Sequence, residues 1–326
     1  MADVTISGLN TNTPAGSDFI PYSSGSQTYK TLVSSLTAGI ATGQLEVGTT
    51  AQRPSPASTG AIRFNTTTNK VEINDGTKWG SINLDYGPYT LEVLVVAGGG
   101  SGGGRGGGGG GGVIPFFNFT ANSLTSYATI VGAGGQDSQF TSSYIAIKGG
   151  VGAAYLEGGG AGGSGGGGGE RGCGGASTPG QGNTGGCGRT GGHPYAGGAG
   201  GGYGGAGANY NGAGGTGYAL DAFVKQVAPF NNLNGEIVTH LGSGGGWNST
   251  TAGVGAGGPG AGGSAGPAKW YGCGGCNGGA GFQGVVVIRY SGSQRGTGGD
   301  FVTYNSNDNK TYHVFTTVGN ATFISN

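Results

Sequence analysis

Residues 91–114 read LEVLVVAGGGSGGGRGGGGGGGVI, and this stretch decides the fold. Its first six residues are mostly Leu and Val, which favour a β-strand. Gly98, Gly100 and Gly103 then have the spacing of a dinucleotide-binding loop, but that loop needs a helix directly after it to hold a pyrophosphate. Each glycine costs about 1 kcal/mol relative to alanine in a helix, so the run Gly106–Gly112 excludes one. The stretch predicts a strand without a nucleotide site.

A run of glycines has one favourable ordered conformation, the polyproline-II helix, with three residues per turn and a rise of about 3.1 Å per residue. Gly106–Gly112 would span roughly 20 Å in this form. The helix has no internal hydrogen bonds, so its N–H and C=O groups need outside partners. Glycine helices carry no side chains and can approach closely enough to bond one another. The sequence therefore predicts a bundle of glycine helices in which the loops and ends carry the larger side chains.

Strand-like sequences surround the glycine tracts. TLEVLVVAGGG (90–100) enters the region and GFQGVVVIRYSG (281–292) leaves it, and both are dense in β-branched residues. GVIPFFNFTANSLTSYATIVGAGG (112–135) and SQFTSSYIAIKGG (138–150) supply further strands. We expect a mainly β protein, with short N-terminal strands and a hairpin module, followed by a β-sandwich whose connections form a polyglycine/polyproline-II helix bundle.

Composition narrows the function classes. The chain has 326 residues, of which 86 are glycine, and 14 basic residues balance 14 acidic ones. A nucleic-acid partner requires a basic footprint, so we expect none. The sequence has no run of eighteen apolar residues and no secretory signal pattern, so we expect neither a membrane span nor classical export.

Two segments precede the glycine region. Residues 1–47 alternate short apolar and polar bursts with Gly, Pro and Asn, which predicts small strands and turns. AIRFNTTTNKVEI (61–73) has strand alternation on both sides of a polar turn at residues 66–69, which predicts a hairpin. DGTKWGSI (75–82) predicts a second turn.

No residue pattern assigns catalysis. G-x-S-x-G matches at Ser101 and Ser164 lie in glycine tracts, and neither precedes the helix that a nucleophile elbow requires. We therefore expect no enzyme activity, no cofactor and no catalytic residue. Four cysteines form a C-x13-C and a C-x2-C pair, for which disulfides, a zinc site and buried thiols all remain alternatives. They are Cys173, Cys187, Cys273 and Cys276.

Large aromatic residues stand singly or in pairs between the glycine islands. At exposed loop tips, Tyr and Trp give a large contact area at low entropic cost. The alternative is that they cap the bundle and shield its edges. Seven of them are receptor-binding candidates: Tyr195, Tyr203, Tyr210, Tyr218, Trp247, Trp270 and Tyr271. The longest segment with little glycine, Tyr218–Leu241, is a second candidate surface.

The N-terminal hairpin sequence resembles a module of bacteriophage tail-fibre and other virion proteins. The resemblance covers residues 48–82, with the TAQRP opening, the RFNT strand and the GTKW ending. SDFIPYSSGSQTYKTLVSSL (17–36) is more loosely similar to the start of phage fibres that hold the fibre to the tail. Short modules of this type usually trimerise, so the resemblance implies a homotrimer.

Residues 91–290 resemble the glycine-rich domain of phage tail fibres, through LVVAGGG, VGAGG and GVVVIRY. They are also similar to the polyglycine-helix adhesins of T-even phages and, more distantly, to the glycine-rich domain of some receptor tyrosine kinases. KTYHVFTTVGNATFI (310–324) departs from the pattern, because in the phage relatives a similar stretch precedes the LVVAGGG strand. This tail either completes the sandwich from its other end or pairs with a neighbouring subunit.

Together the resemblances imply a virion tail-fibre protein, made in the host cytoplasm, that binds a bacterial surface receptor through its glycine-rich domain. The receptor is an outer-membrane protein or lipopolysaccharide, and the N-terminus joins the phage tail or another virion protein. The alternatives are a purely structural fibre or capsid-decoration subunit, a glycan-degrading enzyme and an ice-binding protein. The expected organisation is an attachment segment, a hairpin module, a glycine-rich domain and C-terminal strands completing the sandwich, at 1–47, 48–83, 84–290 and 291–326.

Overall fold

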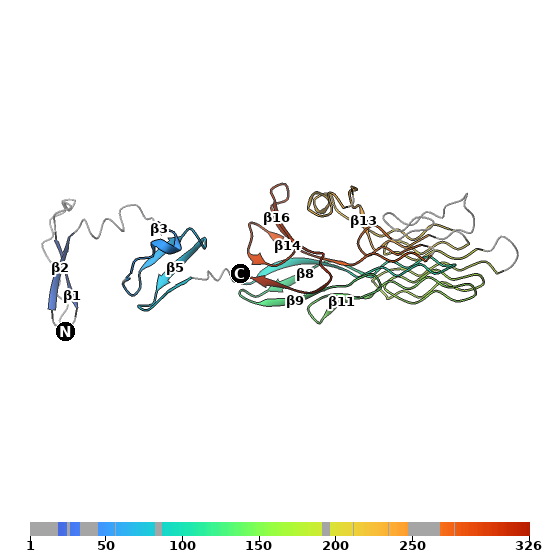
Figure 1. The fold of residues 1–326 in the computed structure, drawn as a ribbon, viewed down its shortest axis with the longest axis horizontal. Coiled ribbons are helices and arrows are strands. Elements are labelled where there is room, and N and C mark those ends of the chain that lie inside the picture. Colours follow the sequence, from blue (N-terminus) through green and yellow to red (C-terminus); the bar gives the residue numbers. More distant parts are fainter. Residues whose placement is uncertain are drawn as a thin grey trace. The chain divides into compact units, whose positions relative to one another are not determined.

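A computed structural model describes most of the chain. The chain forms two compact units, Met1–Leu84 and Asp85–Asn326 (Figure 1). No helix in the described part is long and apolar enough to cross a membrane. The described residues are 45–55, 57–81, 87–190, 196–210, 212–233, 235–246, 268–276 and 278–326, with the backbone of the antiparallel strands β1 (Phe19–Ser24) and β2 (Gln27–Leu32).

The first unit contains a four-stranded sheet in the order β3-β4-β5-β6. β4 and β5 form the predicted antiparallel hairpin around residues 66–69, and β3 joins β4 in parallel. A short 3-10 helix, η1 (Thr50–Gln52), follows β3. The strands are β3 (Glu46–Gly48), β4 (Ile62–Asn65), β5 (Lys70–Asn74) and β6 (Trp79–Ser81).

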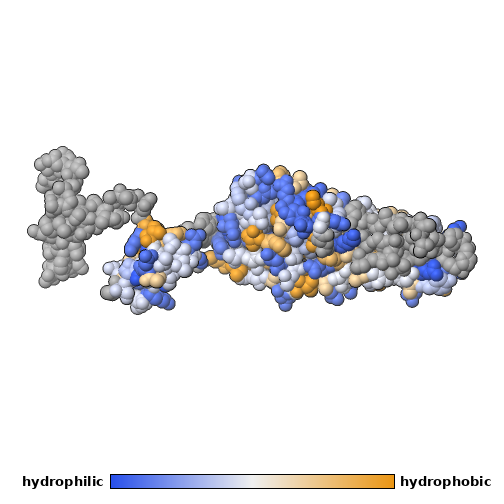
Figure 2. Space-filling model, turned by 45° about the horizontal axis from the view of Figure 1, so that its top comes forward, coloured by the Kyte–Doolittle hydropathy of each residue, from blue (hydrophilic) through white to orange (hydrophobic). Residues whose placement is uncertain are grey.

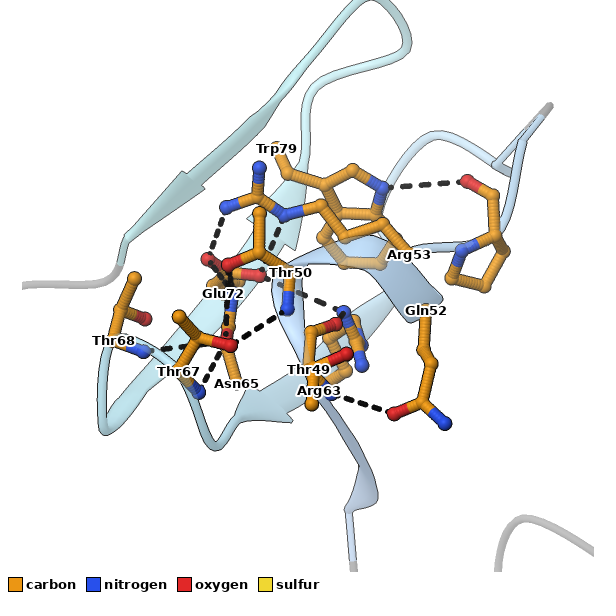
Figure 3. A network of polar contacts seen from close by, with 11 residues as sticks. Thr49, Thr50, Gln52, Arg53, Arg63, Asn65, Thr67, Thr68, Glu72 and Trp79 are labelled. Atoms are coloured by element: carbon orange, nitrogen blue, oxygen red, sulfur yellow. Dashed lines mark hydrogen bonds and ion pairs between the residues drawn. The ribbon is translucent and has the colours of Figure 1, made fainter.

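One face of this sheet buries a polar network (Figure 3). Arg53 donates two hydrogen bonds to the Glu72 carboxylate, at 3.1 and 2.5 Å, and the Asn65 amide donates a third at 2.8 Å. Arg63 lies 3.9 Å from the same carboxylate and donates to the carbonyl oxygen of Thr49. The hydrogen bonds from Arg53, opposed by burial and helped by Asn65, lower the pKa of Glu72. The carboxylate is therefore ionised at neutral pH and compensates the buried Arg63.

The opposite face of the sheet is apolar and exposed. Ile62 pairs with Ile73 and Phe64 with Val71, so alternation places all four side chains on the face opposite Glu72. Val47, which pairs with Phe64, joins them. Val47 is 62% exposed, and no apolar side chain of residues 45–55 and 57–81 is buried. Figure 2 shows hydrophobic residues at the surface of this unit. We call these five residues the apolar face.

The second unit is built on two five-stranded sheets, in the orders β11-β10-β9-β18-β15 and β16-β17-β14-β7-β8. Their longest pairings are antiparallel. The mainly β sandwich expected from the sequence is confirmed. Its strands are β7 (Tyr89–Val96), β8 (Val113–Ala121), β9 (Ser126–Val131), β10 (Ser138–Phe140), β11 (Tyr144–Ala146), β14 (Val285–Ser291), β15 (Gly296–Thr297), β16 (Phe301–Asn305), β17 (Lys310–Phe315) and β18 (Gly319–Ser325).

Both faces of strand β7 are buried over residues 93–96, which explains the continuous apolar sequence there. Leu91, Val93 and Val95 belong to the core shared with Phe140 and Phe323 of the other sheet. Fully burying one such side chain contributes roughly 1.5–3 kcal/mol. Leu94 and Val96, on the other face of β7, belong to a second core on the outer side of this sheet.

The segment 218–241 covers that outer side of the sheet. It contains two short paired strands, β12 (Tyr218–Ala219) and β13 (His240–Leu241), and a 3-10 helix, η2 (Val224–Gln226). Its buried side chains pack with those of β7, β14 and β17 into one core. They are Leu220, Val224, Val227, Phe230, Val238 and Leu241. The second unit thus has three layers at its sandwich end.

The C-terminal tail supplies inner strands to both sheets of its own chain. β17 pairs with β14 and β16 in one sheet, and β18 pairs with β9 and β15 in the other. Of the two arrangements that the sequence allowed, the structure has the tail within the sandwich of the same subunit.

A buried polar chain crosses the sandwich at His313, which is fully buried. Its Nδ1 lies 2.6 Å from the carbonyl oxygen of Gly298 and its Nε2 lies 2.9 Å from the hydroxyl of Tyr290. The Tyr290 hydroxyl accepts the N–H of Arg295, so it donates its own proton to Nε2. The ring is therefore neutral, with its proton on Nδ1, and burial lowers the pKa of His313.

We expect acid to destabilise the second unit through His313. The unfolded state takes up a proton near pH 6.5 while the folded state does not, so stability falls below pH 6.5 by up to about 1.4 kcal/mol per pH unit until the lowered folded pKa is reached. Replacement of His313 by Gln should flatten this slope between pH 6.5 and 5. The measurement is urea unfolding across that range for both proteins. Equal slopes would contradict the prediction.

The glycine tracts form the expected bundle of extended helices (Figure 1). The run Gly106–Gly112 lies inside it, and its N–H groups donate hydrogen bonds of 2.7–3.1 Å. Every third residue bonds the same neighbour, which is the period of a polyproline-II helix. The three accepting neighbours are 147–153, 198–201 and 272–275. The three donating neighbours are 97–103, 164–167 and 242–245. One glycine helix therefore has six hydrogen-bonded neighbours.

The close packing of these helices excludes side chains. A Cβ atom placed on Gly107 would lie 2.0 Å from the carbonyl oxygen of Gly245, and one on Gly109 would lie 2.2 Å from that of Ser164. Distances below 3.0 Å to backbone atoms are incompatible with a real Cβ. Glycine is thus required inside the bundle, because a side chain would push the hydrogen-bonded backbones apart.

Candidate functional site

Side chains gather where the outward and return runs of the bundle meet, away from the sandwich. Runs 97–103, 147–153 and 163–169 each lead outward, because they are antiparallel to 106–112, which returns to β8. Runs 182–188 and 205–208 are parallel to 163–169. Figure 1 shows the bundle extending away from the two sheets. We call the segments that end these outward runs the distal turns, namely 104–105, 154–157, 170–171, 189–190 and 209–210.

The first two distal turns are joined to each other. The N–H of Arg105 donates to the carbonyl oxygen of Ala153 at 3.0 Å, and the Arg105 guanidinium lies 5.1 Å from the ring centre of Tyr155. Tyr155 is 47% exposed and Leu156 is 57% exposed. A cation over an aromatic ring orients both groups while leaving the ring edge accessible. These turns therefore present an ordered aromatic and aliphatic surface.

The last distal turn carries a second exposed tyrosine. Tyr210 is 53% exposed, and its φ of 52° is unusual for an aromatic residue. The strained turn is held by two bonds to Cys187, whose N–H donates to Asn209 Oδ1 at 2.6 Å and whose carbonyl accepts the N–H of Tyr210 at 3.1 Å. Strain of this kind persists only where the surroundings enforce it, and it is frequent at binding sites. We call Arg105, Tyr155, Leu156 and Tyr210 the distal surface.

The other predicted aromatic residues lie elsewhere. Tyr195 and Trp247 fall outside the described residues. Tyr203 and Tyr218 form an edge-to-face pair, with ring centres 5.5 Å apart, and pack half-buried against the outer core. Burial raises the pKa of Tyr218, and the nearby Asp221 adds to this effect. This pair contributes to the layer formed by the segment 218–241.

Trp270 and Tyr271 are buried, with 8% and 3% of their surfaces exposed. The indole N–H of Trp270 donates to Glu236 at 3.2 Å, and the Tyr271 ring packs edge-to-face on Phe230 and Phe282. Burial raises the pKa of Tyr271 to about 12. Both residues fasten the segment 218–241 to the sheet, which is the shielding role that the sequence left as the alternative. They are therefore not part of the distal surface.

An ion-pair cluster also holds the segment 218–241 to the sheet. Arg289 of β14 bonds Glu92 and Asp221, each at 2.7 Å, and lies 3.9 Å from the ring centre of Phe116. Burial opposes ionisation of both carboxylates, yet their hydrogen bonds dominate and lower the pKa of each. The cluster joins Asp221 to the sheet. The segment 218–241, the second surface predicted from the sequence, therefore covers the sandwich.

The four cysteines occupy two separate places. Cys173 is exposed and Cys187 half-buried on neighbouring runs near the distal turns. Cys273 and Cys276 are buried in the bundle, and burial raises the pKa of each to about 11. All four are in the thiol form in the structure. Among the described residues, no three His, Cys, Asp or Glu side chains converge on one point as metal ligands would.

The serines of the two G-x-S-x-G matches lie within the glycine runs. Ser164 is buried in the run 163–169, and neither Ser164 nor Ser101 is followed by a helix among the described residues. A nucleophile elbow needs a strand-to-helix turn that exposes the hydroxyl. Neither serine has that setting.

Sequence reasoning missed Arg105, Tyr155 and Leu156. The available signal was the island AAYLE at 153–157, which interrupts two glycine runs with large side chains. The aromatic residues selected from the sequence all lie after residue 190. Within polyglycine, any island that separates an outward from a return run is placed at an end of the bundle, and this rule would have selected AAYLE.

The fold and the comparison with known families identify the same class of protein, one with a glycine-rich domain. A glycine-rich domain family matches residues 73–291, which is more than half of the chain. The chain belongs to this glycine-rich domain family. No curated protein and no solved structure gave a significant match.

Proposed function

We propose that this chain is a bacteriophage tail-fibre protein that attaches the virion to its host through the distal surface. The observation that carries the proposal is the bundle itself, a rigid glycine scaffold whose exposed Tyr155, Leu156 and Tyr210 lie at the end away from the sandwich. Rigid aromatic anchors lose little entropy on binding. The phage resemblance of residues 48–82 and 91–290 supports the assignment to a virion.

The receptor is a bacterial outer-membrane protein or lipopolysaccharide, and the N-terminal unit joins the fibre to the tail or to another virion protein. The chain acts by binding and needs no cofactor. Three copies at one tip raise the effective concentration, so a modest affinity per site suffices for attachment.

We further propose that copies of the chain form a homotrimer through the apolar face of the first unit. The described residues of this unit bury Arg63, Asn65, Glu72 and Asn74 but no apolar side chain. Burial of apolar side chains stabilises a sheet, and in this unit that burial has to come from contact with another copy of the chain. The apolar face carries no charge, so a second copy of it is a complementary partner without like-charge repulsion.

The experiment that tests attachment uses the full-length chain, fluorescently labelled, on a panel of Gram-negative strains. We expect saturable binding to at least one strain. Replacing Tyr155, Leu156 and Tyr210 by Ala together should weaken that binding at least tenfold, because hot-spot aromatic residues each contribute about 1–2 kcal/mol or more. The measurement is the dissociation constant from cell-bound fluorescence.

The matched control replaces Leu124 and Tyr304 by Ala, since both are exposed, by 54% and 49%, but lie on the sandwich. This variant should bind like the unmodified chain. Equal weakening in both variants would remove the distal surface from the proposal. Absence of binding to every strain would favour the alternative, a structural fibre or capsid-decoration subunit without a receptor role.

A further inference from the structure

Two neighbouring glycine runs place a pair of cysteines opposite each other. The N–H of Gly188 donates to the carbonyl oxygen of Gly172 at 2.9 Å, and the N–H of Gly185 donates to that of Gly175 at 3.0 Å. In both pairs the residue numbers have the same sum, so the runs are antiparallel. The same register places Cys173 directly opposite Cys187.

The two side chains meet in this register. The side chains of Cys173 and Cys187 interact, and this interaction raises the pKa of the Cys173 thiol. Cys173 is exposed and Cys187 half-buried, so a small oxidant can reach the pair. The flanking runs consist largely of glycine and are fixed by their hydrogen bonds to further runs, which keeps the two thiols adjacent.

We propose that Cys173 and Cys187 form an intramolecular disulfide when the protein meets an oxidising small-molecule disulfide such as glutathione disulfide. The Cys173 thiolate attacks one sulfur of the oxidant, forming a mixed disulfide and releasing one glutathione thiolate. The Cys187 thiolate then attacks the Cys173 sulfur and releases the second. The protein loses two protons and two electrons, and one glutathione disulfide becomes two glutathione molecules.

The extended geometry of the glycine runs excludes a disulfide between the two cysteines of the C-x2-C pair. Cys273 and Cys276 are three residues apart on an extended run, and the polyproline-II rise separates their Cα atoms by about 9 Å. A disulfide requires a Cα separation of about 4.4–6.8 Å. Both thiols are also buried. The more widely spaced pair in the sequence is therefore the one that can be bridged.

The bridge would brace the distal end of the bundle. It closes a loop of about 15 residues and so restricts the unfolded chain. Cys187 also holds the Asn209–Tyr210 turn through both of its backbone groups. Oxidation therefore stabilises the support of Tyr210 without placing the disulfide in the distal surface. This inference does not depend on the chain being a receptor-binding protein.

Peptide mass spectrometry tests the pairing on the full-length chain. Arg171 and Arg189 bound a tryptic peptide, 172–189, that contains both proposed partners. Lys269 and Arg289 bound a second, 270–289, that contains the other two cysteines. After incubation with glutathione disulfide, we expect peptide 172–189 to lose the mass of two hydrogen atoms and peptide 270–289 to keep both thiols. Two intact thiols in 172–189, a bridge in 270–289, or covalent dimers would each overturn the proposal.

Thermal unfolding tests the bracing. Oxidation should raise the Tm of the second unit by about 5–10 °C, and reductant should reverse the shift. The variant Cys173→Ser, which keeps a small polar side chain at an exposed position, should have a Tm that does not respond to either reagent. If the bridge forms in the unmodified chain and its Tm stays constant, the bracing role is wrong. The interaction with Cys187 raises the pKa of Cys173, so oxidation should be faster at higher pH.

Discussion

Replacing Gly109 by Ala is expected to destabilise the second unit by more than about 3 kcal/mol, beyond the usual 1–3 kcal/mol of an over-packed core. The added Cβ would lie 2.2 Å from the carbonyl oxygen of Ser164. The clash is with backbone on a neighbouring helix, so no rotamer change relieves it. Separating the two helices would break the hydrogen bonds that the N–H groups of Ser164 and Gly167 donate to the carbonyl oxygens of Gly110 and Gly107.

The measurement is hydrogen exchange of residues 106–112 in the full-length chain, together with its thermal unfolding. The matched control is Gly104→Ala in the first distal turn, where no atom lies within 4 Å of the added Cβ. This variant should be neutral or slightly more stable, because alanine restricts the unfolded chain. Similar losses in both variants would show that the effect belongs to alanine in polyglycine generally and not to close helix contact.

Charges on the apolar face are expected to convert the full-length chain from an oligomer to a monomer. Ile62 and Ile73 face each other across β4 and β5 and are 44% and 38% exposed. Replacing both with Asp would place like charges from every copy around one contact, where burial of an unpaired charge is strongly unfavourable. We expect the mass from sedimentation velocity to fall from that of a trimer to that of one chain.

The control for this variant is Thr68→Asp, an exposed position in the turn between the same two strands. It adds a charge to the unit outside the apolar face and should leave the mass unchanged. Thermal unfolding of the second unit should be the same in all three proteins, which separates loss of association from general misfolding. A monomeric unmodified chain would contradict the proposed homotrimer, while leaving the attachment function to be tested by cell binding.

The architecture was readable from the sequence because glycine has so few ordered options. The β-branched residues at 91–96 and 285–290 identified the strands that frame the bundle. The seven glycines at 106–112 identified its inner helix, since only mutual hydrogen bonding could satisfy their backbones. The positions of the β-branched residues and of the glycine run thus predicted both the strands and the bundle.

The sites were less predictable, because the sequence does not show at which end of a run an aromatic residue lies. Trp270 and Tyr271 precede an outward run and therefore sit beside the sandwich, whereas Tyr155 follows one and sits at the distal end. The hairpin of the first unit was predicted correctly, but its buried face was not, for another reason. Alternation in β4 and β5 identified two faces but not that Glu72 would belong to the buried one.

The hydrogen bonds between glycine helices run across the long axis of the bundle and not along it. A force that pulls along that axis therefore loads many of these bonds in shear at the same moment, and none can open alone as in a zipper. A strand pair pulled from one end would break bond by bond. The six neighbours of the helix 106–112 extend this load sharing in every lateral direction, so the bundle should resist tension far better than its low content of side-chain contacts implies.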